Sequence, residues 1–300
     1  MWHMSLNLRL VLGLTAGILS AIFAHVLLSS TIPEFANAIT FGLLAIVLLF
    51  FSYRWYVDLR VRIQSIQAMS VSISRDIEKQ RAIANLMPLM RGNFFPFGTW
   101  AMEPVYLLDL LASMQAGKVD TVVECGAGVS TLLIGNLLKQ KGQGHIYSLE
   151  EDSEWCDLVI RSAEEQHLED YVTVVHAPLE PYTASSMFAG KWYSLSCAGA
   201  ILDKISSIDF LIVDGPKTSE SLSRFPALPV FVQKCDTHTR IVLDDTNRVQ
   251  EQCVLGVWQE TYRLAISFDQ RAERHQAHIT LEDMPGKHQD LEHRKGITEP

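Results

Sequence analysis

The chain has few cysteines, and no two of them stand at the spacing of a metal or redox motif. Its five cysteines are scattered along 300 residues and their number is odd: Cys125, Cys156, Cys197, Cys235 and Cys253. This pattern argues against a disulfide framework and against a zinc site. It favours reduced thiols in a cytosolic compartment.

A basic charge balance is also missing. The net charge is −9, so no overall electrostatic attraction draws the chain to nucleic acid, and nucleic acid is not among the expected partners. The length allows one ordinary domain plus additional segments. The composition is 48% hydrophobic with a mean hydropathy of +0.12, which is high for a soluble protein, and the excess lies in the first sixty residues.

Two long apolar runs account for that excess. Leu10–Leu28 holds one ionisable residue, His25, and Phe35–Tyr53 holds none. Each is long enough to span a hydrocarbon core of about 30 Å as a helix. The short polar stretch "SSTIPE" with Pro33 separates them. We predict a transmembrane helical hairpin over residues 8–56, with membrane lipid as a partner. A cleaved signal peptide and a buried hairpin are the alternatives.

Positive residues near the two runs set the expected orientation. Arg9 precedes the first run and Arg54, Arg60 and Arg62 follow the second, whereas the connecting loop carries only Glu34. Lys and Arg accumulate on the cytoplasmic side of membrane segments. We therefore expect a two-pass protein of the inner (cytoplasmic) membrane, with both termini and the remaining domain in the cytoplasm.

The segment 57–95 is predicted to be a helical stalk or linker. Ile63, Ile66, Ile73 and Ile77 recur at spacings of 3, 7 and 4. This spacing allows a parallel coiled coil that joins two chains into a homodimer. A lone amphipathic stalk, resting on the membrane or on its own domain, is the other interpretation, and the sequence leaves both open.

Strand and helix patterns alternate over residues 96–284, and the polar residues 285–300 are expected to be a flexible tail. Buried strands such as "TVVEC", "HIYSLE" and "IDFLIVD" are separated by helical segments, and "YRLAISFD" with "QAHITLED" forms a closing pair. The alternation predicts an α/β fold with a doubly wound sheet. In such sheets ligands bind at the carboxyl ends of the strands. Acidic residues stand at these ends: Glu124, Glu150, Asp214 and Asp244.

The turn "ECGAGVST" follows the first of these strands. Gly126 and Gly128 let backbone N–H groups approach a ligand, but a dinucleotide fingerprint needs a third glycine, and Thr131 stands there. Glu124 directly before the turn disfavours a diphosphate. Glu150 is placed to accept ribose hydroxyls, although NAD enzymes also use an acid there. Together these residues favour S-adenosylmethionine (SAM), whose amine and sulfonium are cationic.

The ordered motifs "VVECGAGVST", "IYSLEED", "YVTVVHAPL", "DFLIVDGP", "SRFPALPV" and "RIVLDD" resemble class I SAM-dependent methyltransferases of the bacterial branch with an ELGSGVST-like first motif. The resemblance covers about residues 95–283 and implies a Rossmann-like sheet. It also implies which residues bind SAM: Glu124, Gly126, Gly128 and Ser130 at the methionine end, Glu150 at the ribose, and Asp152 or Ala177 near the adenine. Thr131 and Asp214 complete this predicted set.

Three residues are candidates for the chemistry. Asp214 ends the fourth strand and can bind the amine of SAM, orient the acceptor or remove its proton. Lys217 either pairs with Asp214, steadies an anionic acceptor or is solvated in an ordinary turn. Asp244, with Asp245 and Asp214, resembles the Mg²⁺ site of catechol-type O-methyltransferases, but the third ligand there is an asparagine. Mg²⁺ therefore stays a lesser alternative, and the metal is unknown.

Residues 178–204 are long for a strand connection and are predicted to form a lid or acceptor wall with Trp192 and Tyr193 as contacts. Trp100 and Glu103 are expected to cover SAM from the other side. The overall prediction is a membrane-anchored SAM-dependent methyltransferase that O-methylates a small-molecule, glycan or lipid-linked acceptor. An NAD(P)-dependent oxidoreductase and a non-catalytic membrane scaffold are the alternatives.

Overall fold

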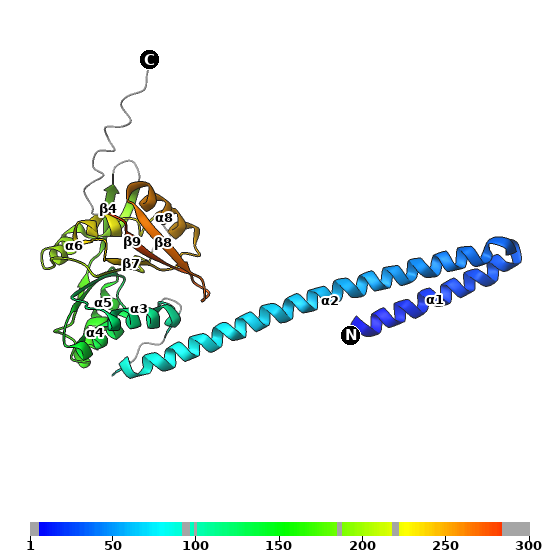
Figure 1. Ribbon diagram of the computed structural model, residues 1–300, viewed down its shortest axis with the longest axis horizontal. Coiled ribbons are helices and arrows are strands. Elements are labelled where there is room, and N and C mark those ends of the chain that lie inside the picture. The colour runs from blue at the N-terminus through cyan, green and yellow to red at the C-terminus, as the bar shows by residue number, and fades with distance from the viewer. Residues whose placement is uncertain (1–5, 92–96, 99–100, 185–187, 218–221, 284–300) are drawn as a thin grey trace, which may run out of the picture. The chain divides into compact units, whose positions relative to one another are not determined.

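A computed structural model describes residues 6–91, 97–98, 101–184, 188–217 and 222–283 (Figure 1). The chain divides into two compact units, Met1–Ser74 and Arg75–Pro300. Trp100 and the predicted tail 285–300 lie outside the described residues.

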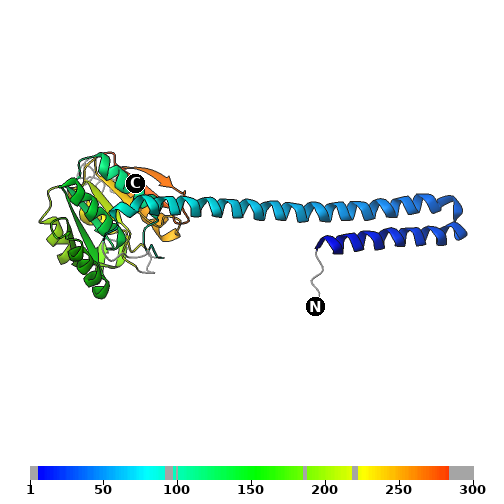
Figure 2. The same ribbon diagram turned by 90° about the horizontal axis from the view of Figure 1, so that it is seen from below.

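The first unit is a helical hairpin. Helix α1 (Leu6–Thr31) runs back beside the first part of helix α2 (Pro33–Leu86), as two perpendicular views show (Figures 1 and 2). A Cβ atom at Gly17 would lie 2.8 Å from the Val47 side chain, so the small residue lets the helices pack closely. His25 Nδ1 lies 3.2 Å from Thr40 Oγ1, which makes this histidine a contact between the two helices.

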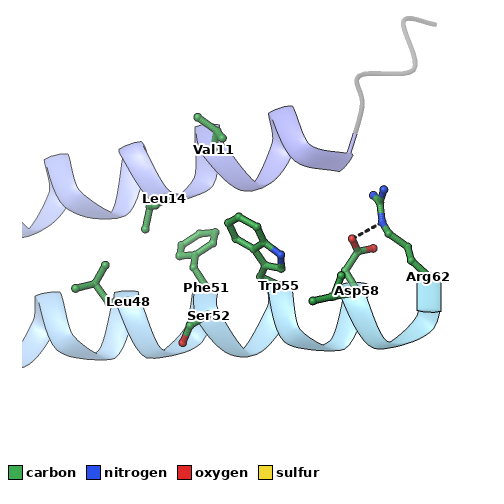
Figure 3. Close-up of a pocket in the computed structure, with 9 residues that line it drawn as sticks. Val11, Leu14, Leu48, Phe51, Ser52, Trp55, Asp58 and Arg62 are labelled. Carbon is green, nitrogen blue, oxygen red and sulfur yellow. Dashed lines mark hydrogen bonds and ion pairs between the residues drawn. The ribbon is translucent and has the colours of Figure 1, made fainter. Parts of the chain in front are cut away.

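Both helices are long and apolar enough to cross a membrane, and only 6% of the residues in each apolar window are buried. A groove of about 550 Å³ separates them near one end (Figure 3). Val11 and Leu14 of α1 face Phe51 of α2 across this groove. Arg62 Nε donates to Asp58 Oδ2 at 2.7 Å on its rim. The hairpin thus has an apolar body with charges at one end.

Helix α2 does not break where the predicted membrane span ends. It continues without interruption through the residues predicted as stalk, and a 3₁₀ turn over Met87–Leu89 follows it. The boundary between the compact units falls after Ser74, inside this long helix. The domain limits 8–56, 57–95 and 96–284 stay predictions, because one continuous helix runs from the first of these segments into the second.

The second unit is built on a seven-stranded sheet with the order β3-β2-β1-β6-β7-β9-β8. All neighbours pair in parallel except β9, which is antiparallel to both β7 and β8. The strands are β1 Thr121–Cys125, β2 His145–Glu150, β3 Val172–His176, β6 Phe210–Val213, β7 Arg240–Leu243, β8 Leu264–Asp269 and β9 Gln276–Leu281. The order reverses between β1 and β6, and parallel sheets bind ligands at such a reversal.

Helices cover both faces of this sheet. The helices are α3 Pro104–Ala116, α4 Val129–Lys141, α5 Ser153–Glu165, α6 Leu195–Leu202, α7 Ala227–Phe231 and α8 Val249–Thr261, with a 3₁₀ turn at Val232–Lys234. Apolar side chains of α3, α4 and α5 share one core with the sheet, and those of α6, α7 and α8 share the other. The prediction of a doubly wound, Rossmann-like sheet with a closing antiparallel pair is confirmed.

The segment predicted as a lid contains a separate hairpin. Strands β4 (Leu179–Ala184) and β5 (Phe188–Tyr193) pair in an antiparallel two-stranded sheet. Trp192 and Tyr193 are 0% and 1% exposed and belong to the core beside α6, α7 and α8. The expectation that these two rings contact an acceptor is wrong, because the hairpin turns them inward, where their large apolar area is buried.

Candidate functional site

The turn after β1 packs directly against the turn after β6. Gly126 adopts φ +98°, and a Cβ there would lie 3.1 Å from the backbone nitrogen of Gly215. A residue with a side chain is strained at this positive φ, so glycine is needed. The Gly126 N–H also donates to the carbonyl of Leu149 at 2.9 Å. The ends of β1, β2 and β6 are thereby held together at one point.

A cavity of about 260 Å³ opens at this point. Four segments line it: residues 98, 101 and 102 before α3, residues 126–130 of the glycine turn, residues 150, 151 and 155 after β2, and residues 214, 215 and 217 after β6. A Cβ at Gly128 would meet no atom within 4 Å, so the space beside this glycine is open. The cavity lies where the order of the sheet predicts a ligand.

Glu150 is the buried acid of the cavity wall, with 1% of its surface exposed. One carboxylate oxygen accepts from the Ala127 N–H at 3.1 Å and the other from the Asp152 N–H at 3.0 Å. Burial raises the pKa of Glu150 to about 7; the charge of Glu151 adds to this rise, and the Asp152 N–H and Lys217 oppose it. Each oxygen keeps a further lone pair with which it can accept a ligand hydroxyl.

An aromatic ring and an amine form the neighbouring wall. Trp155 donates its indole N–H to the carbonyl of Ala127 at 2.8 Å, which fixes the ring beside the glycine turn. The Lys217 ammonium lies 5.4 Å from the centre of this ring. The backbone N–H of Lys217 donates to Glu151 Oε1 at 2.8 Å. Lys217, predicted as catalytic, thus lies at the cavity and is engaged with Trp155.

Glu124 occupies a different place from the one expected. Its carboxylate accepts hydrogen bonds from Ser130 Oγ at 2.5 Å, Thr131 Oγ1 at 2.5 Å and Ser148 Oγ at 2.7 Å, and it is fully buried. Burial raises the pKa of Glu124, and these three hydroxyls oppose the rise. Neither Glu124 nor Thr131 lines the cavity. They hold the first turn of α4 against β1 and β2. Ser130 takes part in this hydrogen-bonded group and also lines the cavity.

Asp152 also has a structural partner. It is the N-cap of α5, where its side chain accepts a hydrogen bond from the backbone N–H of Trp155 at 2.9 Å. Its side chain is exposed and does not line the cavity. An N-cap of this kind satisfies one of the helix's free N–H groups. Asp152 therefore positions Trp155 rather than facing the cavity itself.

Three carboxylates gather behind the β6 wall. Oxygen atoms of Asp214, Asp244 and Asp245 lie within 4.8 Å of one another. Arg224 reaches the same place from the segment before α7. Its Nη2 lies 3.0 Å from Asp245 Oδ2 and 3.5 Å from Asp214 Oδ1. Its Nη1 donates to the carbonyl of Asp244 at 2.9 Å. Sequence reasoning missed this buried guanidinium, although "SRFPALPV" was among the motifs.

This arrangement does not fit a divalent cation. Mg²⁺ needs carboxylate oxygens free to approach within about 2.1 Å. Here the Arg224 guanidinium, 4% exposed, already binds Asp214 and Asp245 and would face the metal's charge. Arg248 Nη1 lies a further 3.1 Å from Asp245 Oδ2. We therefore derive no chemistry through a metal.

Asp214 is the only member of this acidic cluster that lines the cavity; Asp244 lies behind it. Burial raises the pKa of Asp214 well above its usual range, and the charge of Asp244 raises it further while Arg224 opposes the rise. Burial likewise raises the pKa of Asp244 to about 6. A carboxyl group with a raised pKa is a better proton acceptor near neutral pH. Glu103, by contrast, pairs with Arg274 at 3.4 Å and does not line the cavity.

The comparisons with known proteins concern this second unit. Residues 123–246 match the family model described as a methyltransferase domain. Among curated proteins, no sequence matches the chain. The match lies within the second unit and includes the glycine turn, Glu150 and Asp214.

Solved structures with a similar arrangement include an O-methyltransferase from Bacillus cereus in complex with SAH, at 13% identity, covering 68% of this chain and 90% of that one, with a TM-score of 0.46. The SAH-bound methyltransferase PaMTH1 from Podospora anserina has 11% identity, coverages of 68% and 95% and a TM-score of 0.49. TrmK from M. capricolum, in complex with S-adenosyl-homocysteine, has 11% identity, coverages of 60% and 68% and a TM-score of 0.38.

Proposed function

We propose that this chain is a membrane-anchored SAM-dependent methyltransferase that transfers a methyl group to an oxygen of a small-molecule, glycan or lipid-linked acceptor. The observation that carries the proposal is the cavity at the ends of β1, β2 and β6, with the buried Glu150 carboxylate in its wall; most of its lining lies in the segment that matches a methyltransferase domain. The glycine turn, the Glu150 carboxylate and the cavity all lie where the strand order of the sheet reverses, between β1 and β6.

The charge of the cavity favours SAM over a dinucleotide. Of its described lining residues, Glu150, Glu151 and Asp214 are acidic and Lys217 is basic. These groups, in their ionised form, would repel a diphosphate, whereas they attract the amine and sulfonium of SAM. The third position of a dinucleotide fingerprint is filled by Thr131, whose hydroxyl is committed to Glu124. These contacts weigh against the NAD(P)-dependent alternative.

Three of the lining residues have a role in holding the donor. Glu150 accepts the ribose hydroxyls, and the open space beside Gly128 admits the donor to the backbone of the turn. Trp155 supplies an apolar face that is fixed by its bond to Ala127. When bound, SAM supplies an electrophilic methyl group on its sulfonium. The rest of the rate comes from alignment of the acceptor and removal of its proton.

Asp214 is the group placed to take that proton. It stands at the cavity, and its raised pKa suits a base. Arg224 holds the Asp214 carboxylate in position from behind, and Asp244 raises its pKa. Lys217 can attract an anionic acceptor oxygen toward the same wall. In this proposal Asp214 and Lys217 are catalytic residues, and Asp244 acts through Asp214.

Membrane anchoring rests on the first unit. Two helices of sufficient length and apolarity, with charged residues beyond the second span, support a two-pass anchor with the enzyme in the cytoplasm. An anchored enzyme meets membrane-linked acceptors at a raised local concentration. The inner membrane of a bacterium is the location this proposal implies.

The test uses the full chain in nanodiscs. Calorimetric titration with SAM and separately with NADH should show binding of SAM alone. Binding of NADH without SAM would reject the proposal in favour of the oxidoreductase. Membrane and soluble extracts are then incubated with protein and methyl-labelled SAM. Labelled product from the wild type, lost in Asp214→Asn, supports catalysis; SAM binding with no product in either extract supports a scaffold. Alkaline carbonate extraction of native membranes tests the anchor independently.

A further inference from the structure

Helix α2 carries a long exposed surface beyond the predicted membrane span. Every residue from Leu59 to Glu78 is exposed, and Ile66 is 66% exposed.

 The side chains of all twenty residues, the isoleucines among them, are therefore accessible from outside the chain. Large apolar side chains that stay exposed along one line mark an interaction surface.

Five of the exposed apolar residues follow a heptad, whereas Val61, Met69 and Val71 are also exposed and lie off it. Stepping from Leu59 by 4, 3, 4, 3 and 4 residues gives the stalk seam, which consists of Leu59, Ile63, Ile66, Ser70, Ile73 and Ile77. Alternating steps of 3 and 4 keep these residues on one face of a helix. Ile63, Ile73 and Ile77 are 47%, 50% and 48% exposed. No charged residue stands on the seam, although charges flank it at Arg60, Arg62 and Asp76.

The flanking charges agree with a parallel pair. In a parallel coiled coil, a residue just before one seam position faces the residue five places later on the other helix. Asp76 and Arg81 are five residues apart at these two positions, and both are exposed. Asp76 of each copy would therefore face Arg81 of the other copy. Opposite charges at these positions favour this orientation and register.

We infer that the stalk seam binds the same seam of a second copy of this chain, so that two chains form a parallel coiled-coil dimer along α2. The inference rests on the membrane anchoring proposed above, because two copies inserted in one bilayer with the same topology present their stalks in parallel. Ser70 interrupts the apolar seam and weakens it. Confinement to one membrane raises the effective concentration of the second copy and offsets that weakness.

Cysteine cross-linking in native membranes tests the pairing. The background is the full chain with Cys197→Ser and Cys253→Ser, which removes the cysteines that are not buried. Ile66→Cys and Ile73→Cys are each introduced on the seam. Ala68→Cys is the matched control, because it is also exposed on α2 but points away from the seam. Mild oxidation should give at least fivefold more disulfide dimer at both seam positions than at position 68.

A second pair of variants tests the seam's packing. With Ile73→Cys as the reporter, Ile66→Asp should abolish the cross-link, because it places a charge in the apolar seam of each copy. Ala68→Asp adds the same charge off the seam and should leave the cross-link intact. Equal cross-linking at positions 66 and 68, or a cross-link that survives Ile66→Asp, would overturn the inference.

The same samples separate this inference from the proposed function. Each variant is titrated with SAM and extracted with carbonate. SAM binding without a seam-specific cross-link rejects the dimer alone. A seam-specific cross-link without SAM binding keeps the dimer and rejects the methyltransferase. Chain recovered in the soluble fraction rejects the anchor and, with it, the membrane-confined dimer inferred here.

Discussion

Replacing Glu150 by glutamine should weaken SAM binding and remove its pH dependence. The wild-type carboxylate is buried in the cavity wall and holds two backbone N–H groups. Glutamine keeps the size of the side chain but carries no negative charge. Its NH₂ group cannot accept a hydrogen bond, so one of the two backbone N–H groups loses its partner. Hydrogen bonds to a charged acceptor contribute about 1.5–3 kcal/mol each. Losing one such contribution predicts a Kd for SAM that is about 10- to 100-fold higher at pH 8.

The pH dependence follows from the raised pKa of about 7. If ionised Glu150 binds SAM, the apparent Kd scales with one plus the ratio of protonated to ionised carboxyl. That factor falls from about 11 at pH 6 to about 1.1 at pH 8, so affinity should increase about tenfold, or about 1.4 kcal/mol. Glu150→Gln should show no such trend. Glu151 and Lys217 lie nearby, and they are unchanged in both proteins.

The same pKa makes an opposite prediction for stability. A buried carboxyl whose pKa is raised from 4.5 to about 7 holds its proton more tightly in the folded state. Its contribution to folding is therefore present below pH 4.5 and is lost as the pH rises to 7. The loss is on the order of 3 kcal/mol without ligand. Glu150→Gln should lack this part of the pH dependence.

Calorimetry of the full chain in nanodiscs at pH 6, 7 and 8 measures the binding side, and thermal unfolding between pH 4.5 and pH 8 without ligand measures the stability side. Glu154→Gln is the matched control, because this glutamate is exposed in the first turn of α5 outside the cavity lining. A Glu150→Gln protein that binds SAM within twofold of the wild type at pH 8 would refute the reasoning. So would a wild-type Kd that is flat between pH 6 and pH 8.

Four further substitutions distinguish structural from ligand-binding roles. Glu124→Ala leaves three buried hydroxyls without their acceptor, and thermal unfolding should show a loss of about 2–3 kcal/mol, with SAM affinity nearly unchanged in the folded protein. Gly126→Ala should cost about 1–3 kcal/mol of stability through its positive φ and the contact with Gly215. Gly128→Ala should instead keep the unfolding temperature and weaken SAM binding about tenfold, because its methyl group enters the open space. Arg224→Met should destabilise by about 3–5 kcal/mol at pH 8 and by less at pH 5, where the carboxyl groups it leaves unpaired can be protonated; equal losses at both pH values would contradict this.

Local pattern was enough for much of this protein. The alternation of apolar strands and amphipathic helices predicted the sheet and its closing antiparallel pair, because each element must bury one face. It also put Glu150 and Asp214 at strand ends, and parallel strands bring such ends to one edge. The two apolar runs predicted long helices because each is long enough to span a hydrocarbon core, although the continuity of α2 through the stalk was not foreseen.

Contacts between distant segments decided the rest. Glu124 is the last but one residue of its strand and Glu150 the last of the next, yet Glu124 accepts a hydrogen bond from Ser148 of that neighbouring strand and does not line the cavity. Arg224 reaches Asp245 only because the segment before α7 folds back over the sheet.

The sequence by itself determined the elements, the glycine turn and the set of acids, because periodicity and backbone constraints act over a few residues. Only the tertiary structure decided which acids face the cavity and which are neutralised by hydroxyls or a guanidinium. Burial makes each charge depend on its nearest neighbours in space, and those neighbours are far apart along the chain.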